Sequence, residues 1–151
     1  MFDRVEECDV PAEVKAFWGP GPWAAEPDRV TSTTGAGYKC TLKRSSHSGA
    51  WLGYVDVPPG HPWHGVGYGD IACPAHGGLT YARTAPNGID WRVGFDCAHL
   101  GDYAPGMVAQ LRSVIGTYAT AGLINASVYR TLAYAEREVR RVANAAARAA
   151  R

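Results

Sequence analysis

Hydrophobic and polar positions alternate in short segments over the first two thirds of the chain. β-Branched and aromatic residues alternate with polar ones over 29–34 and 37–44, and a more apolar segment follows at 50–57. This two-residue period predicts β-strands. The last segment should end at Pro58-Pro59-Gly60, because a proline cannot donate a hydrogen bond to a neighbouring strand. We therefore predict three strands that pair as an antiparallel meander.

Two further segments have the composition of strands. A Gly-Gly turn leads into an apolar stretch over 77–81, and Trp91-Arg92-Val93-Gly94-Phe95 lies within another over 90–95. Asn87-Gly88, just before the second, is a common sequence in tight hairpin turns. The sheet is thus predicted to have about five strands, mainly antiparallel.

The last third of the chain has a helical period. Apolar residues recur at helical spacing over 107–118, and again over 127–148, where the arginines lie mostly on other faces. The second pattern predicts a long C-terminal helix over 127–148 that packs on one face of the sheet. We expect Val128, Leu132, Val139 and Val142 to make that contact.

These elements predict an α+β fold in a single domain over 1–151. The first 28 residues are expected to form an N-terminal arm with a short helix after Pro11, because the Pro- and Gly-rich stretch at 19–28 cannot continue a helix. Residues 149–151 are expected to form a frayed tail.

Composition and charge exclude several classes of protein. The chain has 151 residues, 46% of them hydrophobic, and its 15 basic and 14 acidic residues nearly cancel, so net charge does not indicate a nucleic-acid partner. The charged start does not resemble a secretory signal, and no stretch is long and apolar enough for a membrane span, so a cytoplasmic protein is expected. Four scattered cysteines without a CxxC pair indicate free thiols rather than disulfides or a zinc ribbon.

Candidate chemistry is concentrated between residues 61 and 102. Four of the five histidines lie there, together with Asp96, Cys97 and Asp102. Imidazole and thiolate are preferred zinc ligands, so a zinc site is the first hypothesis, although the spacing does not match a helical HExxH motif. The expected metal ligands are His61, His64, His76 and His99, with Cys97 as a further candidate.

Proton transfer and nucleophilic attack are a related hypothesis. A hydrolase-like site would use His76 and His99 to move protons, Asp96 and Asp102 to orient them, and Cys97 as ligand or nucleophile. A buried structural cysteine is the alternative for Cys97, since most free cysteines are packed in the core.

A binding pocket without catalysis is the other hypothesis. Trp63 and Tyr68 could stack on a nucleotide-like ligand, and the turn that contains Gly77, Gly78 and Thr80 could bring backbone donors close to it. The sequence has no GxGxxG or P-loop motif, so a nucleoside triphosphatase is not expected. The glycines could equally serve tight turns alone.

Three segments together resemble a known group of proteins. VPPGHPWHG over 57–65, HGGLTY over 76–81 and GFDCAH over 94–99 are similar to motifs of a family of small uncharacterised proteins from bacteriophages and prophages. The resemblance implies a phage accessory protein in the host cytosol. Such a protein could act against host defence by hydrolysing or sequestering a small nucleotide signal. The sequence leaves a homo-oligomer open.

Overall fold

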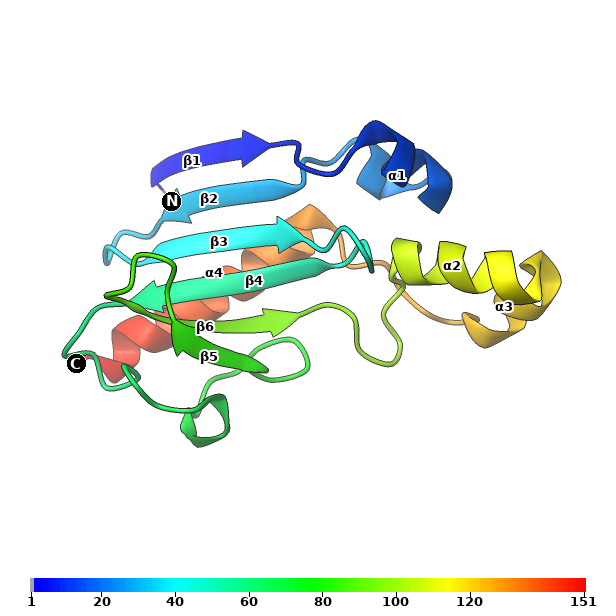
Figure 1. Ribbon diagram of the computed structural model, residues 1–151. Coiled ribbons are helices and arrows are strands. Elements are labelled where there is room, and N and C mark those ends of the chain that lie inside the picture. The colour runs from blue at the N-terminus through cyan, green and yellow to red at the C-terminus, as the bar shows by residue number, and fades with distance from the viewer. Residues whose placement is uncertain (1) are drawn as a thin grey trace.

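Six antiparallel strands form one sheet, with a long helix against one of its faces (Figure 1). The computed structural model describes residues 2–151, and its strand order is β1-β2-β3-β4-β6-β5. The predicted α+β class is confirmed. The strands are β1 (Phe2–Glu7), β2 (Arg29–Thr33), β3 (Lys39–Arg44), β4 (Trp51–Val57), β5 (Tyr81–Thr84) and β6 (Trp91–Asp96).

The first strand was not predicted. β1 pairs with β2 at the edge of the sheet, where all six of its residues are exposed. Its sequence has no alternation because neither of its faces is buried, so backbone pairing alone makes it a strand. The segment predicted as an arm therefore contains β1, the short helix α1 (Ala12–Trp18) that was expected after Pro11, and the 3₁₀ turn η1 (Pro22–Ala24).

The core lies between the sheet and helix α4 (Leu132–Ala149). Alternate residues of the central strands point toward this helix, as the burial of Trp51, Val55 and Val57 in β4 shows. α4 contributes a stripe of small and branched side chains, as its helical period predicted. The members of this stripe that are almost fully buried are Ala135, Val139, Val142, Ala143 and Ala146.

Two predicted helix boundaries were wrong. α4 begins at Leu132, where the Thr131 side chain accepts a hydrogen bond from the backbone N–H of Tyr134 (3.2 Å), and Val128 lies before it, half-exposed. The helix predicted over 107–118 is two helices, α2 (Pro105–Ile115) and α3 (Thr117–Leu123). Gly116 separates them with a φ of 88°, a left-handed conformation that suits glycine. Both lie beyond the end of the sheet (Figure 1).

The long connection between β4 and β5 runs along α4 in the opposite direction. His61, near its start, contacts the carbonyl oxygen of Ala146 late in the helix (2.8 Å), and His76, near its end, contacts Tyr134 in the first turn (2.6 Å). The connection includes the 3₁₀ turn η2 (Tyr68–Asp70). Among residues 2–151, no helix has both the length and the apolar character that a membrane crossing needs.

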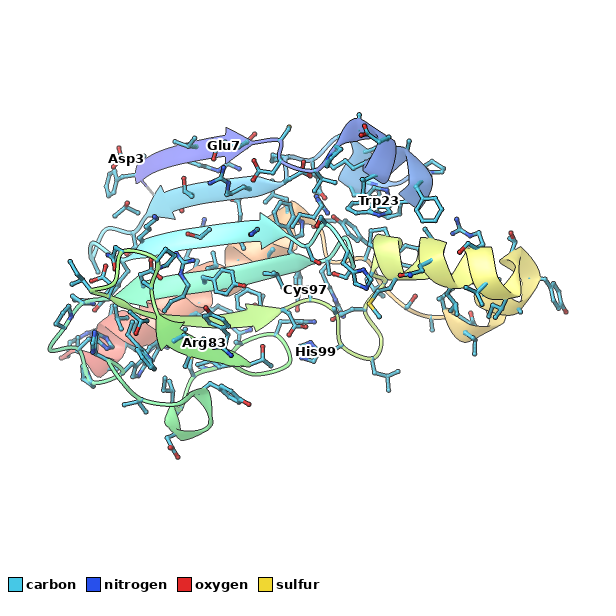
Figure 2. All side chains as sticks on the ribbon, in the orientation of Figure 1. Asp3, Glu7, Trp23, Arg83, Cys97 and His99 are labelled. Atoms are coloured by element: carbon cyan, nitrogen blue, oxygen red, sulfur yellow. The ribbon has the colours of Figure 1, made fainter. Side chains whose placement is uncertain are left out.

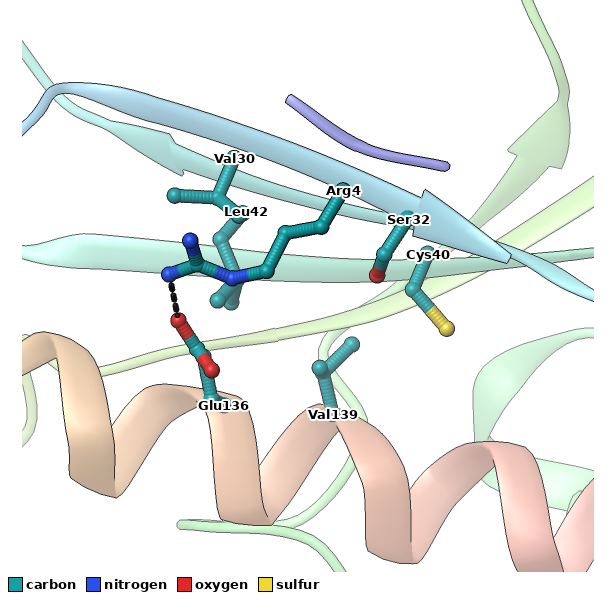
Figure 3. Close-up of a pocket in the computed structure, with 7 residues that line it drawn as sticks. All are labelled: Arg4, Val30, Ser32, Cys40, Leu42, Glu136 and Val139. Carbon is teal, nitrogen blue, oxygen red and sulfur yellow. Dashed lines mark hydrogen bonds and ion pairs between the residues drawn. The ribbon is translucent and has the colours of Figure 1, made fainter. Parts of the chain in front are cut away.

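A small cavity lies between the sheet and α4 near β1 (Figure 3). Arg4 reaches over it from β1 and forms an ion pair with Glu136 of α4 (2.6 Å). Its volume is about 10 Å³, close to the least that one water molecule occupies. It is therefore a packing gap rather than a ligand site.

Candidate functional site

Two histidines and an aspartate converge where β6 ends. His76 comes from the connection that precedes β5, and His99 and Asp102 come from the loop that leads from β6 to α2; Figure 2 shows His99 in this loop. One potential ligand atom from each residue lies within 4.8 Å of the other two. We call these three residues the His/Asp cluster.

Both ring nitrogens of His76 make short contacts. Its Nε2 lies 2.7 Å from Oδ2 of Asp102, and its Nδ1 lies 2.6 Å from the hydroxyl of Tyr134. A neutral imidazole satisfies both contacts by donating from Nε2 and accepting from the tyrosine at Nδ1. The ring is thereby held from two sides, and only 12% of the side chain is exposed.

Asp102 is the best-connected member of the cluster. Its side chain is 2% exposed, and it accepts hydrogen bonds from Nε of Arg130 (2.8 Å) and from the backbone N–H of His99 (3.0 Å) as well as from His76. Burial opposes ionisation, but these donors outweigh it and lower the pKa of the Asp102 carboxyl below its ordinary value. The group is therefore a carboxylate at neutral pH.

His99 has an unsatisfied ring nitrogen. Its Nδ1 lies 3.4 Å from Oδ1 of Asp96 and 3.8 Å from Oδ2 of Asp102, but neither contact has the geometry of a hydrogen bond. This buried atom therefore has no hydrogen-bond partner within residues 2–151. The ring lies directly over Gly77, where a Cβ atom would be 2.4 Å from it. Gly77 thus makes room for His99, a different role from the predicted approach of backbone to ligand.

Asp96 and Thr80 form the rim beside His99. The Thr80 hydroxyl donates to Asp96 Oδ2 (3.1 Å), and the other carboxylate oxygen accepts from the backbone N–H of Ala98 (3.1 Å). Asp96 therefore lies next to His99, as the hydrolase hypothesis predicted, while Thr80 orients Asp96.

The donor set of the cluster fits a transition metal. Two imidazoles and one carboxylate are ligands that Zn²⁺ uses in catalytic sites, where a fourth position stays open. The unpartnered Nδ1 of His99 is available for such a bond, and Tyr134 occupies the second nitrogen of His76 as outer partners of metal-bound histidines do. Asp102 and His76 would exchange their mutual hydrogen bond for bonds to the ion.

An open groove of about 640 Å³ adjoins the cluster. His99 and Asp102 belong to its lining, and the loop before α2, α2 and α3 supply most of the rest. His47, which precedes β4, and Ile124 and Ser127, which follow α3, complete it. Its apolar side chains include Leu100, Met107, Leu111, Val114, Leu123 and Ile124.

His61 and His64 lie apart from the cluster, so the predicted set of four histidine ligands was wrong. Both follow β4, whose last residue pairs with Trp91 at the start of β6, whereas His99 follows the end of β6. The segment after β4 and the loop after β6 are therefore separated by the length of β6, which is five residue steps or about 17 Å. His61 is also committed elsewhere, because its two nitrogens contact the Ala146 carbonyl and the backbone N–H of Trp63.

Cys97 and Trp63 occupy places that do not suit their predicted roles. Cys97 is 2% exposed, and burial together with the nearby Asp102 and Asp96 carboxylates raises the pKa of its thiol to about 12. A thiol in this environment is the packed structural cysteine that was the alternative. Trp63 is 6% exposed within the core and offers no free stacking face. Tyr68 is half-exposed on η2 and Gly78 has open space around it, so for these two residues ligand contact stays a prediction.

Two site residues were missed by the sequence prediction. Tyr134, in the first turn of α4, contacts His76, and Arg130, in the segment just before α4, contacts Asp102. The guanidinium of Arg130 also lies 4.9 Å from the centre of the Tyr134 ring. Burial raises the pKa of Tyr134, and so does Glu138, so this residue stays a neutral phenol. The sequence prediction placed both residues in the helix over 127–148, and no local pattern connected them with His76 or Asp102.

A buried polar network fixes the start of α4. Glu26 accepts hydrogen bonds from the Tyr129 hydroxyl (2.5 Å) and from the backbone N–H of Leu132 (2.6 Å). Arg44, whose side chain is fully buried, contacts Glu26 and Asp28. This network fixes the position of the segment that contains Arg130 and Tyr134, and so places these two side chains at the site.

No family model, curated protein or solved structure matches this chain significantly. The resemblance to phage proteins therefore stays a prediction, and functional conclusions depend on the site itself.

Proposed function

We propose that the protein is a metal-assisted hydrolase whose His76, His99 and Asp102 bind Zn²⁺ or a similar transition metal. The carrying observation is the convergence of one potential ligand atom from each of these three residues within 4.8 Å. In addition, His99 Nδ1, which lies 3.8 Å from Oδ2 of Asp102, is buried without a hydrogen-bond partner. A buried nitrogen that gave up water and gained no partner loses free energy, and a metal bond would recover it.

The residues around the cluster support this assignment. Tyr134 holds the second nitrogen of His76, which fixes the ring orientation, and Arg130 holds the second oxygen of Asp102. A bound Zn²⁺ would supply a Lewis acid and a water of lowered pKa. Asp96, 30% exposed and 3.4 Å from His99, is placed to accept a proton from attacking water and return it to the leaving group.

The groove beside the cluster supplies room for a substrate. Its volume lies within the range of small-molecule sites, roughly 300–1,000 Å³. Its lining includes neither Phe, Tyr or Trp nor Lys or Arg, whereas a nucleotide site would use stacking rings and phosphate-binding cations. We therefore place a less polar substrate ahead of the nucleotide signal that the sequence suggested.

Metal binding is tested first. Untagged protein is stripped with chelator and titrated with ZnCl₂ by calorimetry, alongside His99→Ala and a control, His64→Ala, in which a partly buried histidine outside the cluster is removed. We expect one Zn²⁺ per chain for the wild type and for His64→Ala, and at least a 100-fold loss of affinity for His99→Ala. Equal affinities for all three proteins would refute the metal site.

Hydrolysis is tested next with the loaded protein on p-nitrophenyl esters and bis(p-nitrophenyl) phosphate. Product in molar excess over protein, lost with Asp96→Asn while Zn²⁺ still binds, is the expected result. Zinc binding without turnover on either substrate class would refute the hydrolase and leave a structural metal site.

A further inference from the structure

We propose that the groove between the His/Asp cluster, α2 and α3 binds an uncharged aliphatic chain of the substrate. The inference rests on the proposed function, because it assigns the chemical class of what lies beside the catalytic groups. The substrates would be compounds, such as medium-chain esters or amides, in which such a chain is joined to a hydrolysable bond.

Several apolar side chains that line the groove are exposed to solvent. Met107, Val114 and Leu123 are 49%, 77% and 70% exposed, and all three line the groove. Contiguous exposed apolar surface of this kind marks a site where something apolar binds, because it gains nothing from contact with water. The three side chains come from two consecutive helices, α2 and α3, which are separated by Gly116, so both helices contribute to the groove.

The groove is lined by few charged side chains. Its lining between residues 47 and 127 contains no lysine or arginine, and its single carboxylate, Asp102, is paired with Arg130. An anionic chain would find no cation there, and a cationic chain would find no free acid. The remaining polar lining groups are the neutral Gln110 and Ser127, together with His47 and His99.

The groove lies directly beside the His/Asp cluster. Because His99 and Asp102 belong to both the groove and the cluster, a chain lying against α2 brings the bond at its end to the catalytic groups. Hydrolysis of an ester would then add water across its C–O bond, so that hydroxide joins the carbonyl carbon and the alcohol leaves with the proton. The apolar contacts would act on binding and position rather than on the chemical step.

Methyl NMR on the metal-free full chain tests the groove without requiring turnover. The Met, Val and Leu methyl signals are followed during titration with 1-butanol and 1-octanol. A fully buried methylene is worth about fourfold in affinity. Because the groove is open on one side, we expect 1-octanol to bind about tenfold more tightly, with saturable shifts at Met107, Val114 and Leu123.

Matched variants on α2 and α3 distinguish binding in the groove from binding to the neighbouring surface. Val114→Glu places a charge in the groove and should weaken 1-octanol at least tenfold; Leu123→Glu on α3 should do the same. Ile115→Glu is the control, because Ile115 is the next residue, is also exposed (40%) and does not line the groove. Circular dichroism checks that each variant is folded.

The outcomes divide cleanly. Alcohol binding without zinc binding or turnover would refute the proposed function but support the aliphatic site. Absence of saturable shifts, or equal weakening by Ile115→Glu, would overturn the site. Concentration-dependent dimerisation in sedimentation that Val114→Glu abolishes would also overturn it, because the face would then be an interface between two copies of this chain.

Discussion

Replacing Gly77 with alanine tests whether His99 must occupy its observed position. A Cβ atom at residue 77 would lie 2.4 Å from Cε1 and 2.6 Å from both nitrogens of the His99 ring, far inside any real contact. The His99 side chain is 33% exposed, so the ring can swing outward. We expect it to do so, and Nδ1 then leaves the position where it could bind a metal.

Gly78 provides the matched control. Gly77 and Gly78 both have left-handed backbones, with φ of 67° and 80°, but nothing lies within 4 Å of a Cβ atom at Gly78. Alanine in this conformation costs about 1–2 kcal/mol at either position. The difference between the two variants therefore isolates the displacement of His99.

The magnitude follows from linkage between binding and folding. At a zinc concentration 100 times the wild-type Kd, binding adds about 2.7 kcal/mol to the free energy of unfolding. If displacement of His99 weakens binding about 100-fold, the same zinc concentration adds only about 0.4 kcal/mol. Urea denaturation with and without zinc should thus show a large gain for the wild type and Gly78→Ala and almost none for Gly77→Ala. Equal gains for the two variants would refute the reasoning.

Three further predictions concern other residues. Glu26→Gln should lower the free energy of unfolding by about 2 kcal/mol in urea denaturation, because the buried Arg44 loses a charged partner; an unchanged value would contradict the role of this network. Burial opposes ionisation of Asp28, but Lys15, the Val10 backbone N–H and Arg44 lower the pKa of its carboxyl. The ionised carboxylate therefore contributes its full share of the free energy of unfolding above the pKa of the unfolded state, near 3.9, and this share disappears as pH falls through the lower pKa of the folded state. Unfolding measured from pH 6 to pH 2 should therefore depend less on pH in Asp28→Asn than in the wild type, and identical slopes would count against this. Cys97→Ala should retain zinc binding and turnover while losing about 1 kcal/mol of stability, and loss of turnover in a folded, zinc-loaded variant would show that the buried thiol takes part after all.

Much of the fold could be predicted from local patterns. The meander β2-β3-β4 and the Asn87-Gly88 hairpin follow from alternation and turn residues, and the buried stripe of α4 follows from helical spacing. β1 could not be predicted, because an edge strand with no buried face has no alternation to detect. The apolar pattern over 107–118 predicted one helix, but Gly116 divides it into two. The spacing of apolar side chains gives no information about the left-handed backbone of this glycine.

Prediction of the site was less complete for a related reason. The segment singled out by its histidines contains His76, His99 and Asp102, which the structure brings together, but it also contains His61 and His64, which lie near the other end of β6. Tyr134 lies 58 residues after His76 and became its partner only because the β4–β5 connection runs antiparallel to α4.

The sequence by itself determined the strands with one buried face, the long amphipathic helix and the concentration of imidazoles and carboxylates in one region, because each is a local property of neighbouring residues. The tertiary structure alone decided which of those groups meet. Because adjacent strands are antiparallel, the residues that follow one strand and those that follow its neighbour lie at opposite ends of the strands. The β4–β5 connection and α4 run in opposite directions, and their packing brings together residues that are far apart in the chain. The His/Asp cluster, its contacts with Arg130 and Tyr134, and the groove beside it are products of that packing.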